Sequence, residues 1–373
     1  MGKIFRIVYT NFLDEETKRL TVGGIQTYIL NLSKLIKSLG HDVIIYQRST
    51  KSDFNCCIEN DIIVKGKYFK KKKRMYYTVH ALSEYCISES DPSDIIIFAS
   101  EAHSIPTTNY SITIQHGICW DIPTHVNWGS MLNRMYMLFR TRKAYIEIKR
   151  LIGSNKVVCV DYNFVNWYRT QIAYQDIDFD VIPNFTEIPE YIQRDTANDE
   201  IKIIFARRFF PYRGTRIFAE AIEKLLQKYN NISVLIAGSG PDEEYLKDKF
   251  MSNKRVSITS FLTTDSLKIH SEYDIAVVPT IGSEGTSLSL LEAMASGCAA
   301  IATNVGGMTN IILSGYNGLL INPTAKDIEN AIEKLILNPE LRNKLSKNGY
   351  ETVKEAFSKE RWQKQWENII QNI

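Results

Sequence analysis

Short apolar runs rich in β-branched residues alternate with amphipathic segments along the whole chain. In the first half the runs lie at 4–9, 42–46, 61–64, 94–99, 111–115 and 156–160, and in the second half at 201–206, 232–237, 256–259, 274–279, 299–303 and 318–321. Between the first two runs, residues 25–39 carry an apolar stripe at helical spacing. Apolar strands that alternate with amphipathic helices are typical of parallel sheets built from βαβ units. The pattern therefore predicts an α/β fold.

The alternation is interrupted near Pro183 and Asn184, which precede a polar stretch that runs to residue 200. A chain of 373 residues is too long for one ordinary core, so this break predicts a boundary between two domains. We expect a first domain over 1–183, a second over 184–356, and a final helix within 357–373. That helix carries Trp362 and Trp366 on one face.

Composition and charge narrow the class of protein. The net charge of +3 is too small to indicate a nucleic-acid partner. The six cysteines show neither metal-ligand nor disulfide-framework spacing, which predicts a reduced, cytoplasmic protein. No apolar run approaches the roughly 18 residues of a membrane span, and the first residues lack a signal-peptide pattern. Any membrane contact is therefore expected to be peripheral, on the inner face of the cell membrane.

Several candidate functional residues directly follow predicted strands, where ligands bind in doubly wound sheets. His116 follows the run at 111–115, and Arg208, Arg213 and Gly214 follow the run at 201–206. A histidine there could orient ligand hydroxyls, although a structural hydrogen-bonding role is also open. Two cations at a helix start could neutralise a phosphorylated ligand.

Glycine pairs occupy helix starts after two further runs. Gly23 and Gly24 precede the helix at 25–39, and Gly238 and Gly240 follow the run at 232–237. Such glycines let the backbone approach a ligand closely, although tight turns alone also select them. The first pair does not form the G-x-G-x-x-G fingerprint, which argues against a nicotinamide dehydrogenase.

The most informative segment has Glu284 and Glu292 with seven residues between them, around a Gly turn and a helix expected to be capped by Ser287. A helix N-terminus beside two carboxylates suits a phosphorylated, hydroxyl-rich ligand. A glycosidase pair would need a separation of about 5 to 9.5 Å. Along a continuous helix the two would lie about 12 Å apart, so hydrogen bonding to ligand hydroxyls is favoured over acid/base catalysis.

Together these motifs resemble the large GT4-like family of retaining glycosyltransferases with the GT-B fold. The resemblance spans nearly all of the chain and is strongest over 201–322. It rests on the E-x7-E spacing of Glu284 and Glu292, the Arg–x4–cation–Gly spacing at 208–214, and the G-x-G-P and T-x-V-G-G turns at 238–241 and 303–307. Arg213 stands where the family has Lys, which alters the geometry of a phosphate contact.

The resemblance implies two Rossmann-like domains facing across a cleft, with the final helix returning to the first domain. The implied reaction is metal-independent, retaining transfer of a sugar from a nucleoside diphosphate to a hydroxyl of a growing glycan, free or lipid-linked, as in surface polysaccharide synthesis. No cofactor is implied, and a UDP-sugar is slightly favoured over a GDP-sugar as co-substrate. The implied catalytic residues are His116, Arg208, Arg213 and Glu284. The implied donor-binding residues are Gly23, Gly24, Gly238, Gly240, Gly285, Thr286, Ser287, Leu288 and Glu292.

Two alternative functions stay open, and a metal-binding motif is set aside. A sugar-nucleotide epimerase or a phosphorylase would keep the fold and change the chemistry. A glycan- or nucleic-acid-binding protein without activity would be a different class. Asp176 and Asp178 form a D-x-D sequence that could hold a metal, but a solvated acidic linker explains it better, and no catalytic metal is expected.

Basic and aromatic residues gather in two stretches of the first domain. Residues 70–74 read Lys-Lys-Lys-Lys-Arg with tyrosine and phenylalanine on either side, and residues 131–150 mix arginine and lysine with methionine, tyrosine, leucine and phenylalanine. Cations and interfacial aromatics favour anionic lipid headgroups. The stretches predict peripheral contact with an anionic membrane, with a solvated helix face as the alternative.

Overall fold

The computed structural model describes residues 2–21, 23–70, 75–118, 131–151, 153–170, 177–191, 193, 200–261, 265–282 and 284–373. The chain divides into two compact units. The first comprises Met1–His116, Val126–Ile182 and Gln363–Ile373, and the second comprises Gly117–His125 and Pro183–Trp362. The final helix contributes residues to both units, with Trp362 in the second and Gln363–Ile373 in the first.

The strands of the first unit form one sheet in the order β3-β4-β2-β1-β5-β6-β7-β8. Their bounds are β1 (Ile4–Val8), β2 (Asp42–Ser49), β3 (Phe54–Ile58), β4 (Ile62–Tyr68), β5 (Ile95–Phe98), β6 (Ser111–Gln115), β7 (Lys156–Cys159) and β8 (Phe179–Val181). All neighbours are parallel except β3, which pairs antiparallel with β4. The pattern of apolar runs missed β3 and β8, because both lie at sheet edges and neither is a continuous buried run.

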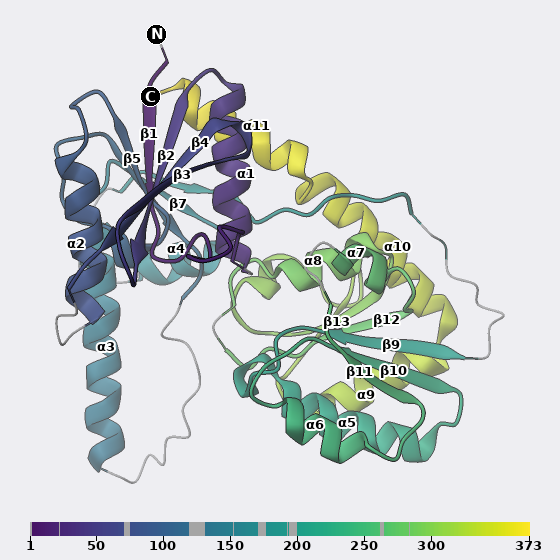
Figure 1. Cartoon of the computed structure of the whole chain (residues 1–373). Helices are drawn as coiled ribbons and strands as arrows, with labels where there is room; N and C mark the ends of the chain where they lie inside the picture. The colour runs from purple at the N-terminus through teal and green to yellow at the C-terminus, as the bar shows by residue number, and fades with distance from the viewer. Residues whose placement is uncertain are drawn as a thin grey trace. The chain divides into compact units, whose positions relative to one another are not determined.

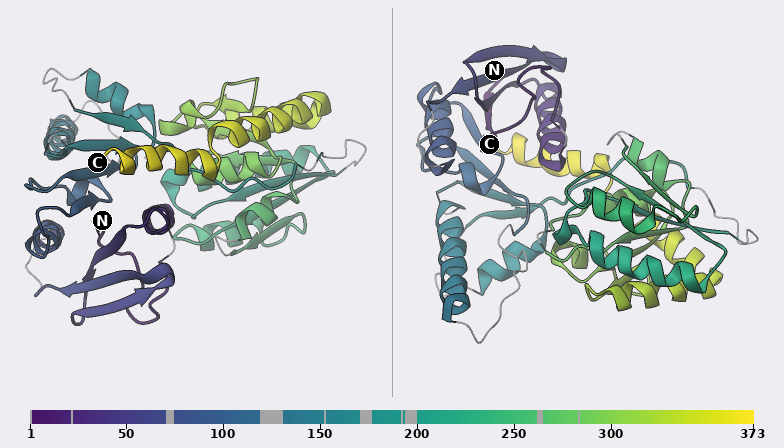
Figure 2. Two further views of the ribbon diagram at one scale, coloured as in Figure 1. Left: turned by 90° about the horizontal axis from the view of Figure 1, so that it is seen from above. Right: turned by 60° about the horizontal axis from the view of Figure 1, so that its bottom comes forward.

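Helices cover both faces of this sheet. They are α1 (Gly24–Ser38), α2 (Met75–Ser88), α3 (Met131–Leu151) and α4 (Tyr162–Arg169), with 3-10 turns η1 (Glu59–Asp61) and η2 (Glu101–His103). Figures 1 and 2 show α2 and α3 on one side of the sheet and α1 on the other. On the α2 side, Val8, Tyr46, Leu82, Ile96 and Phe98 form a buried cluster.

The strands of the second unit form a parallel sheet in the order β11-β10-β9-β12-β13-β14. Their bounds are β9 (Ile201–Ala206), β10 (Ile232–Ala237), β11 (Val256–Thr259), β12 (Ile275–Val278), β13 (Ala299–Thr303) and β14 (Leu319–Ile321). The chain runs outward from β9 to β11 and then returns to begin again at β12. Strand order thus reverses between β9 and β12, the position where doubly wound sheets bind ligands.

Helices also sandwich the second sheet. They are α5 (Thr215–Lys228), α6 (Glu243–Phe250), α7 (Ser266–His270), α8 (Leu288–Ala295), α9 (Ala325–Leu337) and α10 (Pro339–Ala356), with 3-10 turns η3 (Pro211–Arg213) and η5 (Gly306–Asn310). Figure 1 shows α5, α6 and α9 on one face and α7, α8 and α10 on the other. On the first face, Phe205 stacks on Phe218 with ring centroids 4.9 Å apart, inside the largest apolar cluster of the unit.

The final helix, α11 (Lys359–Gln371), supplies one tryptophan to each core. The Trp362 ring lies 4.6 Å from that of Phe185 in the second unit. The Trp366 indole N–H donates a hydrogen bond of 2.7 Å to the Tyr28 hydroxyl on α1 in the first unit. Both indoles are almost fully buried. The predicted α/β architecture of two Rossmann-like units is confirmed.

Candidate active site

The second unit brings Arg207 and Glu284 together at the point where its strand order reverses. Arg207 is the first residue after β9, and Glu284 lies in the loop that follows β12. Because β9 and β12 are hydrogen-bonded neighbours, the two loops leave the same sheet edge side by side. Residues 77 positions apart therefore meet, which no local pattern of the sequence reveals.

Three groups converge on one carboxylate oxygen of Glu284. The Arg207 guanidinium donates to Oε2 at 2.6 Å, the Thr280 hydroxyl donates to it at 2.8 Å, and Arg213 on η3 donates to the same atom. Arg207 also donates to the Thr280 hydroxyl. Glu284 is only 8% exposed, so these bonds replace the water that the carboxylate loses on folding.

The two guanidinium groups decide the charge state of Glu284. Burial by itself would raise the pKa of this carboxyl, but Arg207 and Arg213, helped by hydrogen bonds from Arg207 and Thr280, outweigh burial and lower the pKa to about 2. Glu284 is therefore fully ionised at neutral pH. The cluster carries two positive charges and one negative charge, so a net positive charge faces an incoming anion.

The backbone around Glu284 is fixed by close packing. Gly306 has a φ of 54°, and a side chain there would overlap the Glu284 carbonyl oxygen. The Gly307 amide donates to that same carbonyl at 3.0 Å. The Thr303 hydroxyl donates to the Thr280 carbonyl. The T-x-V-G-G turn at 303–307 thus holds the loop that carries Glu284, as only glycine permits at the crossing point.

Arg208, the predicted partner of Arg213, has a different environment from Arg207. Its side chain is exposed, and its guanidinium carbon lies 5.5 Å from the centre of the Phe210 ring. Arg213 is partly buried, with its guanidinium carbon 5.1 Å from the Tyr212 ring centre. The sequence pattern therefore indicated Arg208 but not Arg207, which is the buried partner of Glu284. Its only local signal was its place as the first residue after a strand.

The turn before α8 contains Gly285, Thr286 and Ser287, followed by Leu288 as the first residue of the helix. The Asn184 side-chain amide donates to the Thr286 carbonyl at 2.7 Å. Ser287 occupies the N-cap position, as predicted, but its hydroxyl makes no capping hydrogen bond to the helix amides and instead lies 3.3 Å from that of Ser289. The first amides of α8 are therefore not occupied by this side chain.

Glu292 lies on α8 and meets α7 through Ser266. The Ser266 hydroxyl donates to Glu292 Oε2 at 2.6 Å, and the His270 ring N–H donates to the Ser266 carbonyl at 2.8 Å. Burial raises the pKa of Glu292 to about 7, against the smaller opposite effect of the Ser266 hydrogen bond. The two glutamates thus differ in charge state near neutral pH, since a guanidinium pair accompanies one and a single hydroxyl the other.

Glu292→Gln should change the stability of the fold by an amount that depends on pH, because burial raises the pKa of the Glu292 carboxyl. The neutral form stabilises the fold below about pH 4.5, and this contribution is lost as the pH rises through about 7. Glu292→Gln, which stays neutral, is expected to raise stability at pH 8 by on the order of 2 kcal/mol relative to its effect at pH 5. Thermal denaturation at the two pH values measures the difference. The exposed Glu244→Gln is the control, and an equal effect of Glu292→Gln at both pH values would contradict the prediction.

The G-x-G-P turn joins the same site from β10. Gly238 has a φ of 151°, and a side chain there would overlap the Arg207 carbonyl oxygen. The Phe209 amide donates to the Ser239 carbonyl at 2.8 Å, which ties this turn to the loop after β9. Gly240 packs beside Phe209 in the same way. The glycines therefore position the arginine loop.

In the first unit, His116 follows β6 and packs edge-on against Tyr28 of α1, with ring centroids 5.1 Å apart. Its Nε2 atom is buried and has no hydrogen-bond partner among the described residues. Burial lowers the pKa of His116 to about 4, partly offset by a hydrogen bond to the Ala99 backbone. The ring is therefore neutral at pH 7, and Nδ1 is left to make the backbone bond. Gly23 and Gly24 begin the same helix that carries Tyr28.

A second buried histidine, His103, lies where the strand order of the first sheet reverses, between β1 and β5. Its ring nitrogens contact the Thr10 hydroxyl at 2.7 Å and the Ser100 hydroxyl at 2.9 Å. Both nitrogens are thus satisfied, and a structural role explains this residue fully.

Some predicted features lie outside the described residues. These are residues 71–74 of the basic run, Asp176 of the D-x-D sequence, and the segment 119–121 after His116. Within the described part of the chain, no group of histidine, cysteine and acidic side chains is arranged to hold a metal ion. No described helix combines the length and apolar character needed to cross a membrane.

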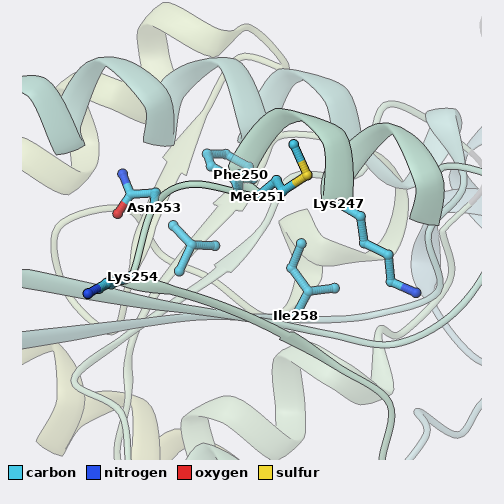
Figure 3. Close-up of a pocket in the computed structure, with 7 residues that line it drawn as sticks. Lys247, Phe250, Met251, Asn253, Lys254 and Ile258 are labelled. Atoms are coloured by element: carbon cyan, nitrogen blue, oxygen red, sulfur yellow. The ribbon is translucent and has the colours of Figure 1, made fainter.

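One surface hollow lies away from the glutamates, between α6 and the edge strand β11. It has a volume of about 390 Å³ and is lined by Lys247, Phe250, Met251, Asn253, Lys254, Val256 and Ile258. Figure 3 shows the apolar side chains of this hollow, with the lysine ammonium groups directed outward. The strand order does not reverse there, and the hollow has no carboxylate. The cluster around Glu284 is therefore the better candidate site.

Several known proteins are similar to this chain in sequence or in structure. The family described as glycosyl transferases group 1 matches residues 188–352. An uncharacterized glycosyltransferase of Methanocaldococcus jannaschii is 25% identical over 94% of this chain and 93% of its own length. The gpi3 subunit of phosphatidylinositol N-acetylglucosaminyltransferase from Schizosaccharomyces pombe is 23% identical over 90% of this chain and 75% of its own length.

The structure of Anabaena HepE in complex with UDP superposes with a TM-score of 0.72, at 14% identity, and covers all of both chains. At this identity the likeness concerns the fold. The matched domain contains both glutamates and the loops after β9, β10 and β12. Residues 188–352 therefore match the family of group 1 glycosyltransferases, and the chain has the GT-B fold.

Proposed function

We propose that the protein is a retaining, metal-independent glycosyltransferase that uses a nucleoside-diphosphate sugar, with a UDP-sugar as the first candidate. The observation that supports this most directly is the buried cluster of Glu284, Arg207 and Arg213 where the strand order reverses. Its net positive charge suits a diphosphate, and its carboxylate suits sugar hydroxyls. Anabaena HepE, which shares the fold, was solved in complex with UDP, and this supports the choice of nucleotide.

The donor would be held by residues of the second unit. Glu284 has one carboxylate oxygen engaged by Arg207, Arg213 and Thr280, so we assign its other oxygen to a hydroxyl of the donor sugar. Arg213 and the exposed Arg208 would contact the diphosphate. Glu292 would bind the ribose hydroxyls, with the amides of Gly285, Thr286 and Ser287 at the start of α8 assisting.

The transfer step forms one bond and breaks another at the anomeric carbon. The acceptor hydroxyl oxygen attacks this carbon on the face from which the diphosphate departs. The bond from the anomeric carbon to the phosphate oxygen breaks, and the nucleoside diphosphate leaves with the electron pair. The hydroxyl proton passes to the departing phosphate oxygen. The arginines stabilise the charge that develops on this leaving group, so their positive charge takes the part that a metal ion plays in other transferases.

His116 is the residue of the first unit proposed to contact sugar hydroxyls. With Nδ1 bonded to the backbone and a pKa of about 4, Nε2 carries a lone pair at neutral pH and can accept a hydrogen bond. The acceptor is proposed to be a glycan hydroxyl, with a lipid-linked glycan as the favoured class. The Schizosaccharomyces pombe relative acts on phosphatidylinositol according to its name, which supports that class.

A thermal-shift panel of nucleosides, nucleoside diphosphates and nucleotide sugars tests the donor. A ligand at about 100 times its Kd should stabilise the fold by about 2.7 kcal/mol. UDP or GDP is expected to raise Tm, and the corresponding nucleoside is expected to raise it less. Arg208→Met should weaken diphosphate binding about tenfold, because one charge-assisted hydrogen bond is lost, and should leave nucleoside binding unchanged. If no nucleotide or nucleotide sugar changes Tm, the proposed donor site is wrong.

A further inference from the structure

Helix α3 in the first unit exposes large apolar side chains that no other described part of the chain covers. Six of them lie within its first nine residues and are 45% to 77% exposed: Met131, Leu132, Met135, Tyr136, Leu138 and Phe139. Figure 1 and the right panel of Figure 2 show this half of α3 extending past the sheet of its unit. An exposed apolar cluster of this density indicates an interaction surface.

The exposed apolar residues of α3 do not lie on the side of the helix that is buried in its own unit. The side of α3 that is buried carries Ala144, Ile148 and Leu151, which follow one another at helical spacing. The outward stripe runs from Met131 through Leu138 to Tyr145, at steps of seven residues. At about 100° per residue, this stripe lies about 120° around the helix from the buried one. A surface helix of a globular unit normally carries polar or charged residues on its outward side.

The charges of α3 are all of one sign over most of its length. From residue 131 to residue 146 the sequence contains arginine and lysine but neither aspartate nor glutamate. Arg134, Arg142 and Lys149 are exposed, and the last two continue the outward stripe beyond its apolar half. A wide apolar stripe bordered only by cations matches the boundary between acyl chains and anionic headgroups. Protein–protein interfaces are instead depleted in lysine and in charged residues near their apolar core.

We propose that the first half of α3, residues 131–139, enters the interface of an anionic lipid bilayer, with Arg142 and Lys149 contacting the headgroups. The helix α2, which packs on η2 together with α3, begins directly after the basic run at 70–74. The inference deepens the proposed function, since it places the enzyme where a lipid-linked acceptor resides.

Co-sedimentation with vesicles tests this surface without any need for a donor or acceptor. The protein should bind vesicles of phosphatidylcholine mixed with phosphatidylglycerol, and bind less to phosphatidylcholine alone. Leu132→Ser combined with Phe139→Ser should weaken binding about tenfold or more, because two apolar side chains no longer enter the interface. The matched control, Leu313→Ser with Leu337→Ser, removes two leucines that are each 67% exposed on the second unit, and should bind like the unaltered chain.

Two further measurements distinguish entry into a bilayer from association of two copies of the chain. A single Phe139→Trp variant should show fluorescence quenching by brominated acyl chains if this position enters the bilayer. Light scattering of the free protein shows whether the stripe instead joins two copies of the chain. Equal vesicle binding by both double variants, or a dimer that Leu132→Ser with Phe139→Ser dissociates, would overturn the proposal. The Tm increase caused by nucleotides should be the same in the α3 variants, so failure here is distinguishable from failure of the proposed function.

Discussion

Glu284→Gln is expected to lower kcat/KM for sugar transfer by about 10²- to 10³-fold, the range typical for loss of one preorganised electrostatic group. The change keeps the shape of the side chain and removes the negative charge that Arg207 and Arg213 share. Two guanidinium groups then face each other with a neutral amide between them. The expected loss of stability is about 3 kcal/mol, because a charged partner has been taken from a buried ion pair.

Initial rates with the donor identified by the thermal-shift panel measure the effect on transfer. Circular dichroism at the assay temperature shows that the variant is folded when the rates are taken. Glu272→Gln removes an exposed acid from the same unit and serves as the control. If Glu284→Gln keeps full activity while folded, the carboxylate is not part of the transfer site.

Arg207→Met should be the most destabilising single change at the site, by about 3–5 kcal/mol at pH 7. Arg207 is the buried partner that lies in a 2.6 Å ion pair with Glu284. Arg208→Met, one residue later, changes an exposed side chain and should alter stability by less than about 0.5 kcal/mol. Urea denaturation of the two variants measures this contrast between adjacent arginines.

The destabilisation by Arg207→Met should also depend on pH in a defined direction. The ionised Glu284 stabilises the fold above the usual carboxyl pKa of 4.5, and this contribution is lost as the pH falls through about 2. Removing Arg207 raises the pKa of Glu284, so the variant has less of this contribution to lose. The stability difference between the unaltered chain and Arg207→Met should therefore be largest at pH 7 and smaller at pH 3.

Arg207→Lys separates a positioning role from a purely structural one. Lysine restores the charge but not the two-pronged contact with Thr280 and Glu284. It should recover part of the stability and return the pH dependence of stability toward that of the unaltered chain. If the difference in stability between pH 7 and pH 3 is the same in the unaltered chain and in both Arg207 variants, Arg207 does not control the ionisation of Glu284.

Much of the fold could be predicted because its signals are local. The apolar runs at 201–206, 232–237 and 299–303 coincide with β9, β10 and β13, since a strand buried on both faces is a continuous apolar run. The final helix was equally clear from the spacing of its tryptophans. The edge strand β3 was not predicted, because its residues alternate between half-buried and exposed. It also contains two cysteines in place of a β-branched run.

The site was predictable only in part. The sequence selected Glu284, Arg213 and the glycines of the nearby turns, because strand ends and turn chemistry mark them. It indicated Arg208 and not Arg207, because identical side chains at neighbouring positions of one loop carry no local signal of which one is buried. It also contained no sign that Ser266 would meet Glu292, since the two lie 26 residues apart on different helices.

By itself, then, the sequence determined the order and type of the main elements and the loops that carry the chemistry, since both follow from the spacing of neighbouring residues. Only the tertiary structure decided which arginine is buried against Glu284, and why the pKa of one glutamate of the motif is lowered while that of the other is raised. It also decided that the apolar residues of α3 face outward. The physical reason is the same in each case: burial and Coulomb interactions depend on which surfaces meet through space. The pairing of β9 with β12 and the contact of α3 with η2 bring together residues far apart in the chain.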